Sequence, residues 1–192
     1  EGLNSSIEAL KVYGTPFTKN KSRVKLPEGI SKESETLLYF GCFTTVKTPK
    51  YAENIARYLI KKDIDFTIIN QEICCGYPIL CTGELKTYEL LVEKNKQLFT
   101  QKGYKKIITT CPSCYMVFKK HYNELGIEIK YFTEYLSHSS KQKLGNLLIQ
   151  HACPLKYIEF PEIENDINKV YEESGYTILD LPHSCCGGGV GH

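Results

Sequence analysis

The sequence has little excess charge and no long hydrophobic run. Its 192 residues carry 24 Lys and Arg against 22 Asp and Glu, a net charge of +2, and nothing in that balance marks a nucleic-acid-binding surface. No apolar stretch approaches the roughly 18 residues of a membrane-spanning helix, and no secretory signal is visible. We therefore expect a globular protein in the cytoplasm, or at the cytoplasmic face of a membrane, with one good-sized domain or two small ones.

Cysteine, by contrast, is unusually abundant. Nine cysteines are many for a cytoplasmic protein, but they fall short of the roughly 8–10% of a small disulfide-rich scaffold. Their number is odd, and two adjacent cysteines make strained disulfide partners. The composition therefore favours metal binding or redox chemistry over structural disulfides.

Short apolar runs alternate with apolar residues at helical spacing along most of the chain. The runs predict strands over 36–40, 65–70, 105–110, 127–132, 144–150 and 176–181. The helical spacing predicts helices over 6–12, 49–62, 83–103 and 112–125. Gly103 and Gly126 stand where two of these helices should end. This order predicts an α/β fold on parallel sheets covered by helices, after a linker or docking arm over residues 1–35.

Five cysteines follow the first three predicted strands of this frame: Cys42, Cys74, Cys75, Cys111 and Cys114. The carboxyl ends of parallel strands face one edge of a sheet, where ligand sites form. We therefore expect the five thiols to meet there. The helices that follow the strands point their N-termini at the same edge, and their partial positive charge stabilises thiolates.

The cysteine spacing repeats once along the chain. Three pairs share an offset of 111 residues: Cys42 and Cys153, Cys74 and Cys185, Cys75 and Cys186. The repeat indicates an internal duplication, with a first half over 36–142 and a second over 143–192. The offset places counterparts of Cys111 and Cys114 near positions 222 and 225, so the second half is incomplete here. We expect the chain to be part of a longer protein.

The motifs that carry these cysteines are YFGCF (39–43), CCGYP (74–78), TTCPSCY (109–115), HACPL (151–155) and CCGGGVG (185–191). Together they resemble the cysteine-rich CCG domain of the heterodisulfide reductase B and D subunits. The same domain occurs in iron–sulfur subunits related to glycolate oxidase, lactate utilisation and glycerol-3-phosphate dehydrogenase. The resemblance covers nearly the whole chain. It implies two CCG halves, each a small, mostly parallel sheet flanked by helices, with the metal site at the carboxyl ends of the strands.

The resemblance also implies a function. It is that of an iron–sulfur subunit in a multi-subunit oxidoreductase, passing electrons through a CCG-bound cluster to a disulfide or to a quinone-linked acceptor. The implied ligands of the first cluster are Cys42, Cys74, Cys75, Cys111 and Cys114, and those of a partial second site are Cys153, Cys185 and Cys186. The implied partners are flavoprotein and ferredoxin-type subunits and a membrane quinone-linked subunit. Residues 12–23 are similar to the linker that follows a ferredoxin domain in fused members.

The identity of the metal stays open between iron and zinc. A tetrahedral zinc site needs four ligands, whereas the first half offers five thiols, which favours a multi-iron cluster. That cluster is a cubane 4Fe–4S centre or the non-cubane form that the resemblance implies. The alternative is a zinc-binding structural CCG domain that organises a redox complex, and thiol redox chemistry without metal is a third interpretation. No catalytic residue is assigned.

Several residues near the motifs have simpler interpretations. Cys81 has no cysteine counterpart and is expected to be a small buried residue. His121 is expected to be an ordinary surface residue, whereas His151 and His183 are either hydrogen-bonded or able to bind metal or deliver a proton. Gly76 is expected to let backbone N–H groups approach the cluster sulfurs.

Overall fold

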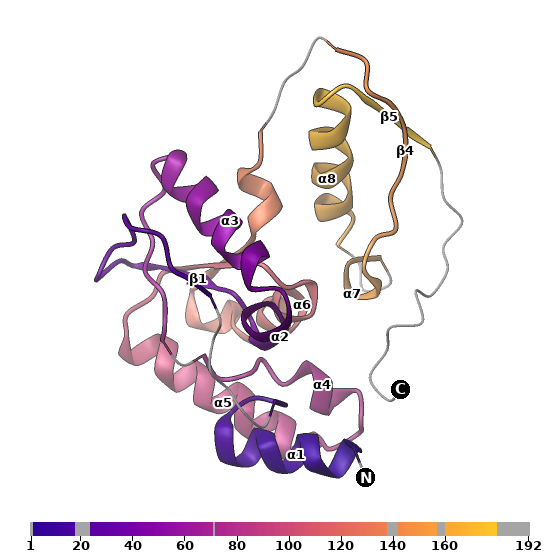
Figure 1. Ribbon diagram of the computed structural model, residues 1–192. Helices are drawn as coiled ribbons and strands as arrows, with labels where there is room; N and C mark the ends of the chain where they lie inside the picture. Colours follow the sequence, from indigo (N-terminus) through magenta and orange to yellow (C-terminus); the bar gives the residue numbers. More distant parts are fainter. Residues whose placement is uncertain (1, 18–23, 71, 138–141, 157–159, 180–192) are drawn as a thin grey trace.

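The chain forms two parallel β-sheets with helices around them (Figure 1). The computed structural model describes residues 2–17, 24–70, 72–137, 142–156 and 160–179. In chain order the elements are α1 (Gly2–Tyr13), β1 (Thr36–Tyr39), α2 (Cys42–Lys47), α3 (Pro49–Lys61), α4 (Tyr77–Leu80), α5 (Leu85–Gln101), β2 (Lys106–Thr109), α6 (Pro112–His121), the 3₁₀ turn η1 (Asn123–Leu125), β3 (Glu128–Tyr131), the 3₁₀ turn η2 (Phe132–Tyr135), β4 (Gly145–Leu148), α7 (Cys153–Lys156), α8 (Pro161–Glu173) and β5 (Tyr176–Leu179). This confirms the predicted α/β class.

The first sheet has three parallel strands in the order β1–β2–β3. Leu37 lies opposite Ile107, which in turn lies opposite Ile129, and all three side chains are buried. Strands covered on both faces read as continuous apolar runs rather than alternating ones, which is why these strands were recognisable from the sequence.

The prediction of a strand over 65–70 is wrong, because only Thr67 in this segment pairs with the sheet. Thr67 makes one parallel bridge to Leu37 on the outer edge of β1. Just before it, the Asp65 carboxylate accepts hydrogen bonds from Ser31 and Ser34 on the incoming loop. The loop that carries Ser31 and Ser34 thus holds the start of the 65–70 segment. The segment pairs with β1 only through the bridge between Thr67 and Leu37. The helix predicted over 112–125 also ends earlier, at His121, and η1 continues it to Leu125.

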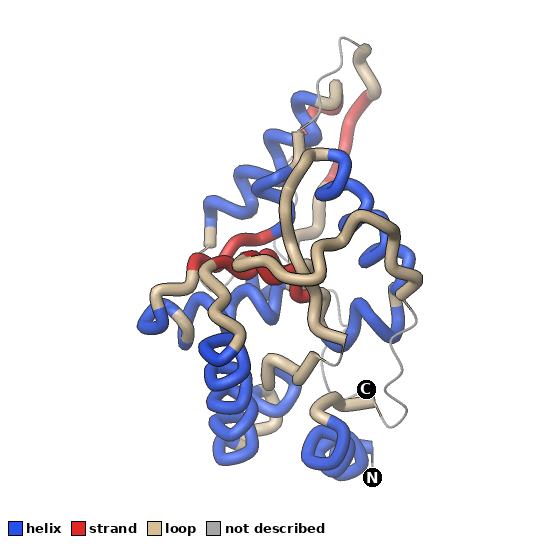
Figure 2. The backbone as a smooth tube through the Cα atoms, turned by 90° about the vertical axis from the view of Figure 1, so that its left-hand side faces the viewer, coloured by secondary structure: helices blue, strands red, loops and turns tan. Residues whose placement is uncertain are grey.

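Helices cover both sides of the first sheet (Figure 1, Figure 2). Helix α3 lies on one side and buries a stripe of Ala52, Ile55, Ala56 and Leu59. Helix α5 lies on the other side together with α6. Gly103 follows α5 with a φ of +70°, the left-handed conformation expected of a glycine after a helix C-terminus.

The core between the sheet and helices α5 and α6 is largely aromatic. Phe118 of α6 lies 4.9 Å from Tyr39, 5.7 Å from Phe99 and 4.9 Å from Tyr122 between ring centroids, each time edge to face. Such pairs add to the stabilisation from apolar burial. The core therefore places α6, which begins beside two of the cysteines, rigidly against β1 and α5.

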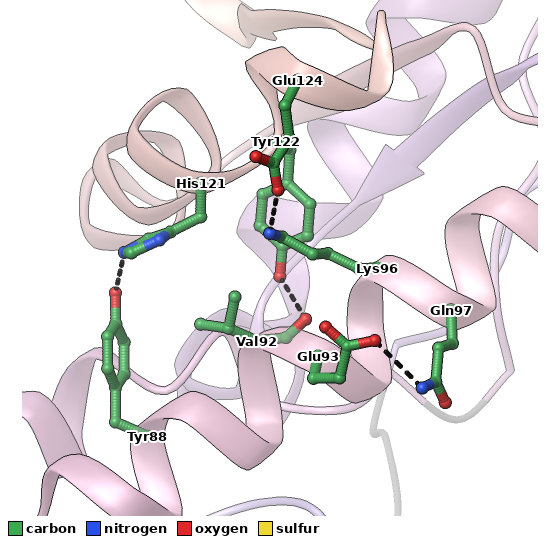
Figure 3. Close-up of polar contacts among 8 residues, drawn as sticks. All are labelled: Tyr88, Val92, Glu93, Lys96, Gln97, His121, Tyr122 and Glu124. Atoms are coloured by element: carbon green, nitrogen blue, oxygen red, sulfur yellow. Dashed lines mark hydrogen bonds and ion pairs between the residues drawn. The ribbon is translucent and has the colours of Figure 1, made fainter.

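Polar contacts also join α5 to α6 (Figure 3). The Tyr122 hydroxyl donates to the carbonyl of Val92 at 3.2 Å, and Tyr88 shares a hydrogen bond of 2.7 Å with the His121 ring. His121 is therefore half-buried and bonded, not an ordinary surface residue as expected. No local pattern indicates this partner, because Tyr88 lies 33 residues earlier.

We expect Tyr122→Phe to lower the free energy of unfolding by about 1 kcal/mol, the usual net contribution of one buried hydrogen bond. The Tyr122 side chain is fully buried, so water cannot replace the lost bond. Urea denaturation followed by circular dichroism measures the change. Tyr13→Phe is the control, because Tyr13 is 54% exposed. Equal stability of the two variants would contradict this account.

The second half repeats the opening of the first. Strands β4 and β5 pair in parallel, with Leu147 opposite Ile178, and α7 and α8 lie between them in the chain. Helix α7 begins at Cys153 as α2 begins at Cys42, so the predicted duplication is present in the structure. The proposed boundaries of the halves at 36 and 143 stay a prediction.

The N-terminal segment, expected to be a linker or docking arm, lies against the first half. Ala9 and Leu10 of α1 are buried, as is Thr15 beyond it. The arm reaches the cysteines directly, because the Cys74 N–H donates to the carbonyl of Gly14 at 2.6 Å. Among the described residues, the helices are too short or too polar to cross a membrane.

Candidate metal centre

Five cysteines from three loops come together at the carboxyl ends of the first sheet. Cys42 opens α2, separated from the end of β1 by Phe40 and Gly41, and the Cys74–Cys75 doublet precedes α4. Cys111 is the N-cap of α6, and Cys114 lies in its first turn. Each loop therefore delivers its thiols at the start of a helix, as the order of strands and cysteines predicts.

The sulfur atoms form a continuous network across the three loops. Cys42 Sγ lies 3.6 Å from Cys74 Sγ. Cys75 interacts with both Cys74 and Cys114, and Cys111 interacts with Cys114. Residues up to 72 positions apart in sequence thus belong to one cluster of thiols.

Gly41 allows this close approach. Its φ is +84°, a conformation that other residues rarely adopt. A Cβ atom at this position would lie 3.1 Å from Cys114 Sγ and 3.2 Å from Cys111 Cβ. The backbone beside Cys42 therefore contacts the Cys111–Cys114 loop with no room for a side chain.

Burial divides the five thiols into two groups. Cys74, Cys75 and Cys114 are at most 2% exposed, whereas Cys42 and Cys111 are half-buried. One side of the network is thus closed by protein, and the side formed by Cys42 and Cys111 is the one that solvent reaches.

Two of the thiols are acidic. Hydrogen bonds from Cys114 and Cys74 lower the pKa of Cys75 to about 6, and a hydrogen bond from Cys114 lowers the pKa of Cys111 to about 7. The pKa of Cys42 is raised by its bond to Cys74 and by burial. Cys75 and Cys111 are therefore the two thiols that these contacts make easiest to deprotonate, and a metal binds the deprotonated form.

The backbone of the doublet is held from several sides. The Asn95 amide of α5 donates to the Cys74 carbonyl at 3.1 Å, and the Tyr39 hydroxyl donates to the carbonyl of Ile73. Asn95 is fully buried, and its Oδ1 has no hydrogen-bond partner among the described residues. With the Gly14 carbonyl on the Cys74 N–H, these bonds fix the loop before any metal binds.

Gly76 makes the N–H contact to sulfur that the sequence suggests. Its N–H donates to Cys74 Sγ at 3.5 Å, and its φ is +93°. A Cβ atom here would lie 2.8 Å from Cδ2 of Tyr88. The glycine thus serves both the turn and the packing behind the doublet.

Glu72 is the polar residue that sequence reasoning missed. Its two carboxylate oxygens accept hydrogen bonds from the N–H groups of Phe40 and Gly41, each at 2.7 Å. Burial raises the pKa of this carboxyl to about 8, although the two N–H bonds act to lower it. The only sequence signal was a single acid two residues before the doublet, and the missed Asn95 is one polar position inside an amphipathic helix.

The other candidate residues are less closely gathered. Cys153 begins α7 and is half-buried. It is near enough to Tyr77 to act on it electrostatically, as Cys75 and Cys81 do. Cys81 is exposed, so the expectation that it is buried is wrong. It follows the short helix α4, in which Ile79 is the residue that faces the core.

The remaining predictions concern the end of the chain. His151 Nε2 lies 3.8 Å from the Glu164 carboxylate, which gives this histidine a structural partner. Cys185, Cys186 and His183 lie outside the described residues, so their assignment to a second site stays a prediction.

The donor set suits only some of the metal centres that thiols hold. An all-cysteine site fits iron–sulfur clusters and zinc. Within the described part of the chain, no three His, Cys, Asp or Glu side chains are arranged as ligands of a single metal ion. The first half does offer five sulfurs, which follow one another from Cys42 through the doublet to Cys114 and Cys111, one more than the four ligands of a single tetrahedral zinc.

Comparison with known proteins gives similar sequences in redox complexes. The B subunit of fumarate reductase (CoM/CoB) from Methanothermobacter marburgensis is 26% identical over 80% of this chain and 32% of its own length. EtfAB:quinone oxidoreductase of Syntrophomonas wolfei is 29% identical over 86% of this chain and 25% of its own length. The D subunit of dihydromethanophenazine:CoB–CoM heterodisulfide reductase from Methanosarcina mazei is 27% identical over 68% of this chain and 35% of its own length. The chain spans about a quarter to a third of these relatives.

No solved structure is a significant match. The model of the family described as "Cysteine-rich domain" (CCG) matches this sequence twice, over residues 36–119 and 147–192. Those two segments contain every cysteine discussed above. The chain therefore belongs to the CCG cysteine-rich domain family.

Proposed function

We propose that the protein is an iron–sulfur subunit of a multi-subunit oxidoreductase and that its first half holds a cluster through which electrons pass. The observation that carries the proposal is the network of five thiols from three loops, with sulfurs as close as 3.6 Å. The names of the relatives support a redox role, because they include a fumarate reductase, a quinone oxidoreductase and a heterodisulfide reductase.

The cluster ligands in this proposal are Cys42, Cys74, Cys75, Cys111 and Cys114. A bound cluster, cubane 4Fe–4S or non-cubane, supplies a one-electron carrier. The protein contributes the rest: Cys75 and Cys111 are the thiols with lowered pKa, the Gly76 N–H donates to a ligand sulfur, and buried side chains keep water from the inner ligands. The half-exposed side at Cys42 and Cys111 is where an electron would enter or leave.

The proposed acceptor follows from the names of the relatives and the proposed partners from the resemblance of the cysteine motifs, rather than from the site. The acceptor would be a disulfide, as for the heterodisulfide reductase, or a quinone-linked carrier, as for the quinone oxidoreductase. The partners would be flavoprotein and ferredoxin-type subunits, with a membrane quinone-linked subunit placing the complex at the cytoplasmic face. Cys153, Cys185 and Cys186 would contribute to a second metal site.

A structural zinc site is the second candidate. The 3.6 Å between Cys42 Sγ and Cys74 Sγ is close to the separation of about 3.8 Å that two thiolates have around one tetrahedral zinc. In that case the first half would organise a redox complex without carrying electrons.

Metal and sulfide analysis of anaerobically purified protein decides between the two candidates. The cluster proposal predicts a brown protein with several irons and matching sulfide per chain. It also predicts an electron paramagnetic resonance signal after one-electron oxidation or reduction. A colourless protein with about one zinc per chain would overturn the cluster proposal and support the structural one.

A further inference from the structure

Glu72 joins two of the three cysteine loops. It lies two residues before Cys74, and its carboxylate accepts from the N–H groups of Phe40 and Gly41, which come directly before Cys42. Both bonds are 2.7 Å long, at the short end of the range for hydrogen bonds from a backbone N–H to oxygen. One side chain therefore closes a bridge between the loop of Cys42 and the loop of the doublet.

The peptide that Glu72 holds is also bonded to the third loop. The Thr110 hydroxyl donates to the carbonyl of Phe40 at 2.7 Å, one residue before Cys111. On the same peptide, the α-carbon of Gly41 faces Cys111 and Cys114 so closely that a Cβ would meet both. The Phe40–Gly41 segment is thus the point where all three loops meet, and the Glu72 carboxyl is the side chain that fixes it.

The bonds to Glu72 also fix the direction of the Phe40 and Gly41 N–H groups. Hydrogen bonds from backbone N–H groups to the sulfurs of a cluster raise its reduction potential. The N–H groups of Phe40 and Gly41 lie beside Cys42, but both are engaged by Glu72, whereas the Gly76 N–H does donate to a sulfur. Glu72 therefore keeps these two N–H groups from donating to the nearby sulfur of Cys42.

We propose that Glu72 is a positioning residue of the first cysteine site. It holds Cys42 against Cys74 and keeps the N–H groups of Phe40 and Gly41 away from the ligand sulfurs. The second part of this inference rests on the proposed iron–sulfur function, whereas the first part concerns the thiols alone.

The first test uses metal-free protein and does not need a cluster. Diamide oxidises two close thiols to a disulfide and takes up their two electrons and two protons. Among the disulfides that these close thiols form, we expect the Cys42–Cys74 disulfide, whose sulfurs lie 3.6 Å apart, to form at least fivefold more slowly in Glu72→Gln than in the wild-type protein. Gln presents one acceptor oxygen where Glu presents two, so one N–H is released. Peptide mapping by mass spectrometry measures the rate.

The second test uses protein reconstituted with iron and sulfide. Glu72→Gln should lose iron to a chelator at least tenfold faster than the wild-type protein, and its midpoint potential should shift upward. Glu72→Ala should lose iron faster still, and acetate, but not chloride, should slow the loss by supplying the missing carboxylate. Glu89→Gln is the matched control, because Glu89 is exposed on α5, and it should behave as wild type.

The outcomes separate this inference from the proposed function. Wild-type protein that takes up no iron contradicts the proposed function, while the diamide rates still test the positioning of Cys42. Iron-loaded variants with wild-type chelation rates and potentials overturn the role of Glu72 and leave the function standing. Loss of folding in both Glu72→Gln and Glu72→Ala would also overturn it, because Glu72 would then be required for folding rather than for positioning the cysteines.

Discussion

Replacing Cys75 with Ser is expected to abolish the iron centre. Cys75 lies in the middle of the thiol network, between Cys74 and Cys114, and its pKa of about 6 makes it the most acidic of the five thiols. Serine has almost the same volume, but its hydroxyl stays protonated at neutral pH and is a poor ligand for iron. Iron and sulfide per chain should fall to background, and the paramagnetic signal should disappear.

The matched control for this variant is Cys81→Ser. Cys81 lies six residues after Cys75, at the end of helix α4, but it is exposed. It should keep the full iron content and spectrum, which shows that the loss in Cys75→Ser is not a general effect of removing a thiol. Circular dichroism should show both variants folded. If Cys75→Ser retained wild-type iron and an unchanged signal, the ligand assignment of the doublet would be wrong.

The gathering of the cysteines was predictable because it depends on the order of elements. Strands β1 and β2 and the helices after them are visible as apolar patterns, and parallel strands present their carboxyl ends at one edge. Knowing that Cys42 follows one strand and Cys111 another was therefore enough to place both thiols together. The duplication was equally readable, since it needs only the equal spacing of cysteines.

The supports of the site were not predictable from the sequence. The bonds from the Phe40 N–H to Glu72 and from Asn95 to the Cys74 carbonyl join residues 32 and 21 positions apart, and no local pattern specifies such pairs. The docking of Gly14 on Cys74 was missed for the same reason. The exposure of Cys81 depends on how the four-residue helix α4 is oriented, which hydrophobic periodicity cannot give for so short an element.

Gly41→Ala is expected to prevent assembly of the centre even though it adds only one methyl group. Gly41 has φ +84° and ψ 151°, a region that is almost restricted to glycine, and an alanine there costs about 1–3 kcal/mol. The added Cβ would also lie 3.1 Å from Cys114 Sγ and 3.2 Å from Cys111 Cβ. To relieve these contacts the loop of Cys42 must move away from the other two loops, which separates the ligands.

Gly103→Ala distinguishes backbone strain from this contact. Gly103 also has positive φ, +70°, but a Cβ there meets no atom within 4 Å. Both variants should therefore lose stability in urea denaturation, whereas only Gly41→Ala should fail to take up iron and sulfide. If Gly41→Ala assembled a centre with wild-type iron content, the three loops would not need to meet at Gly41, and the close approach of Gly41 to Cys111 and Cys114 could not be what forms the site.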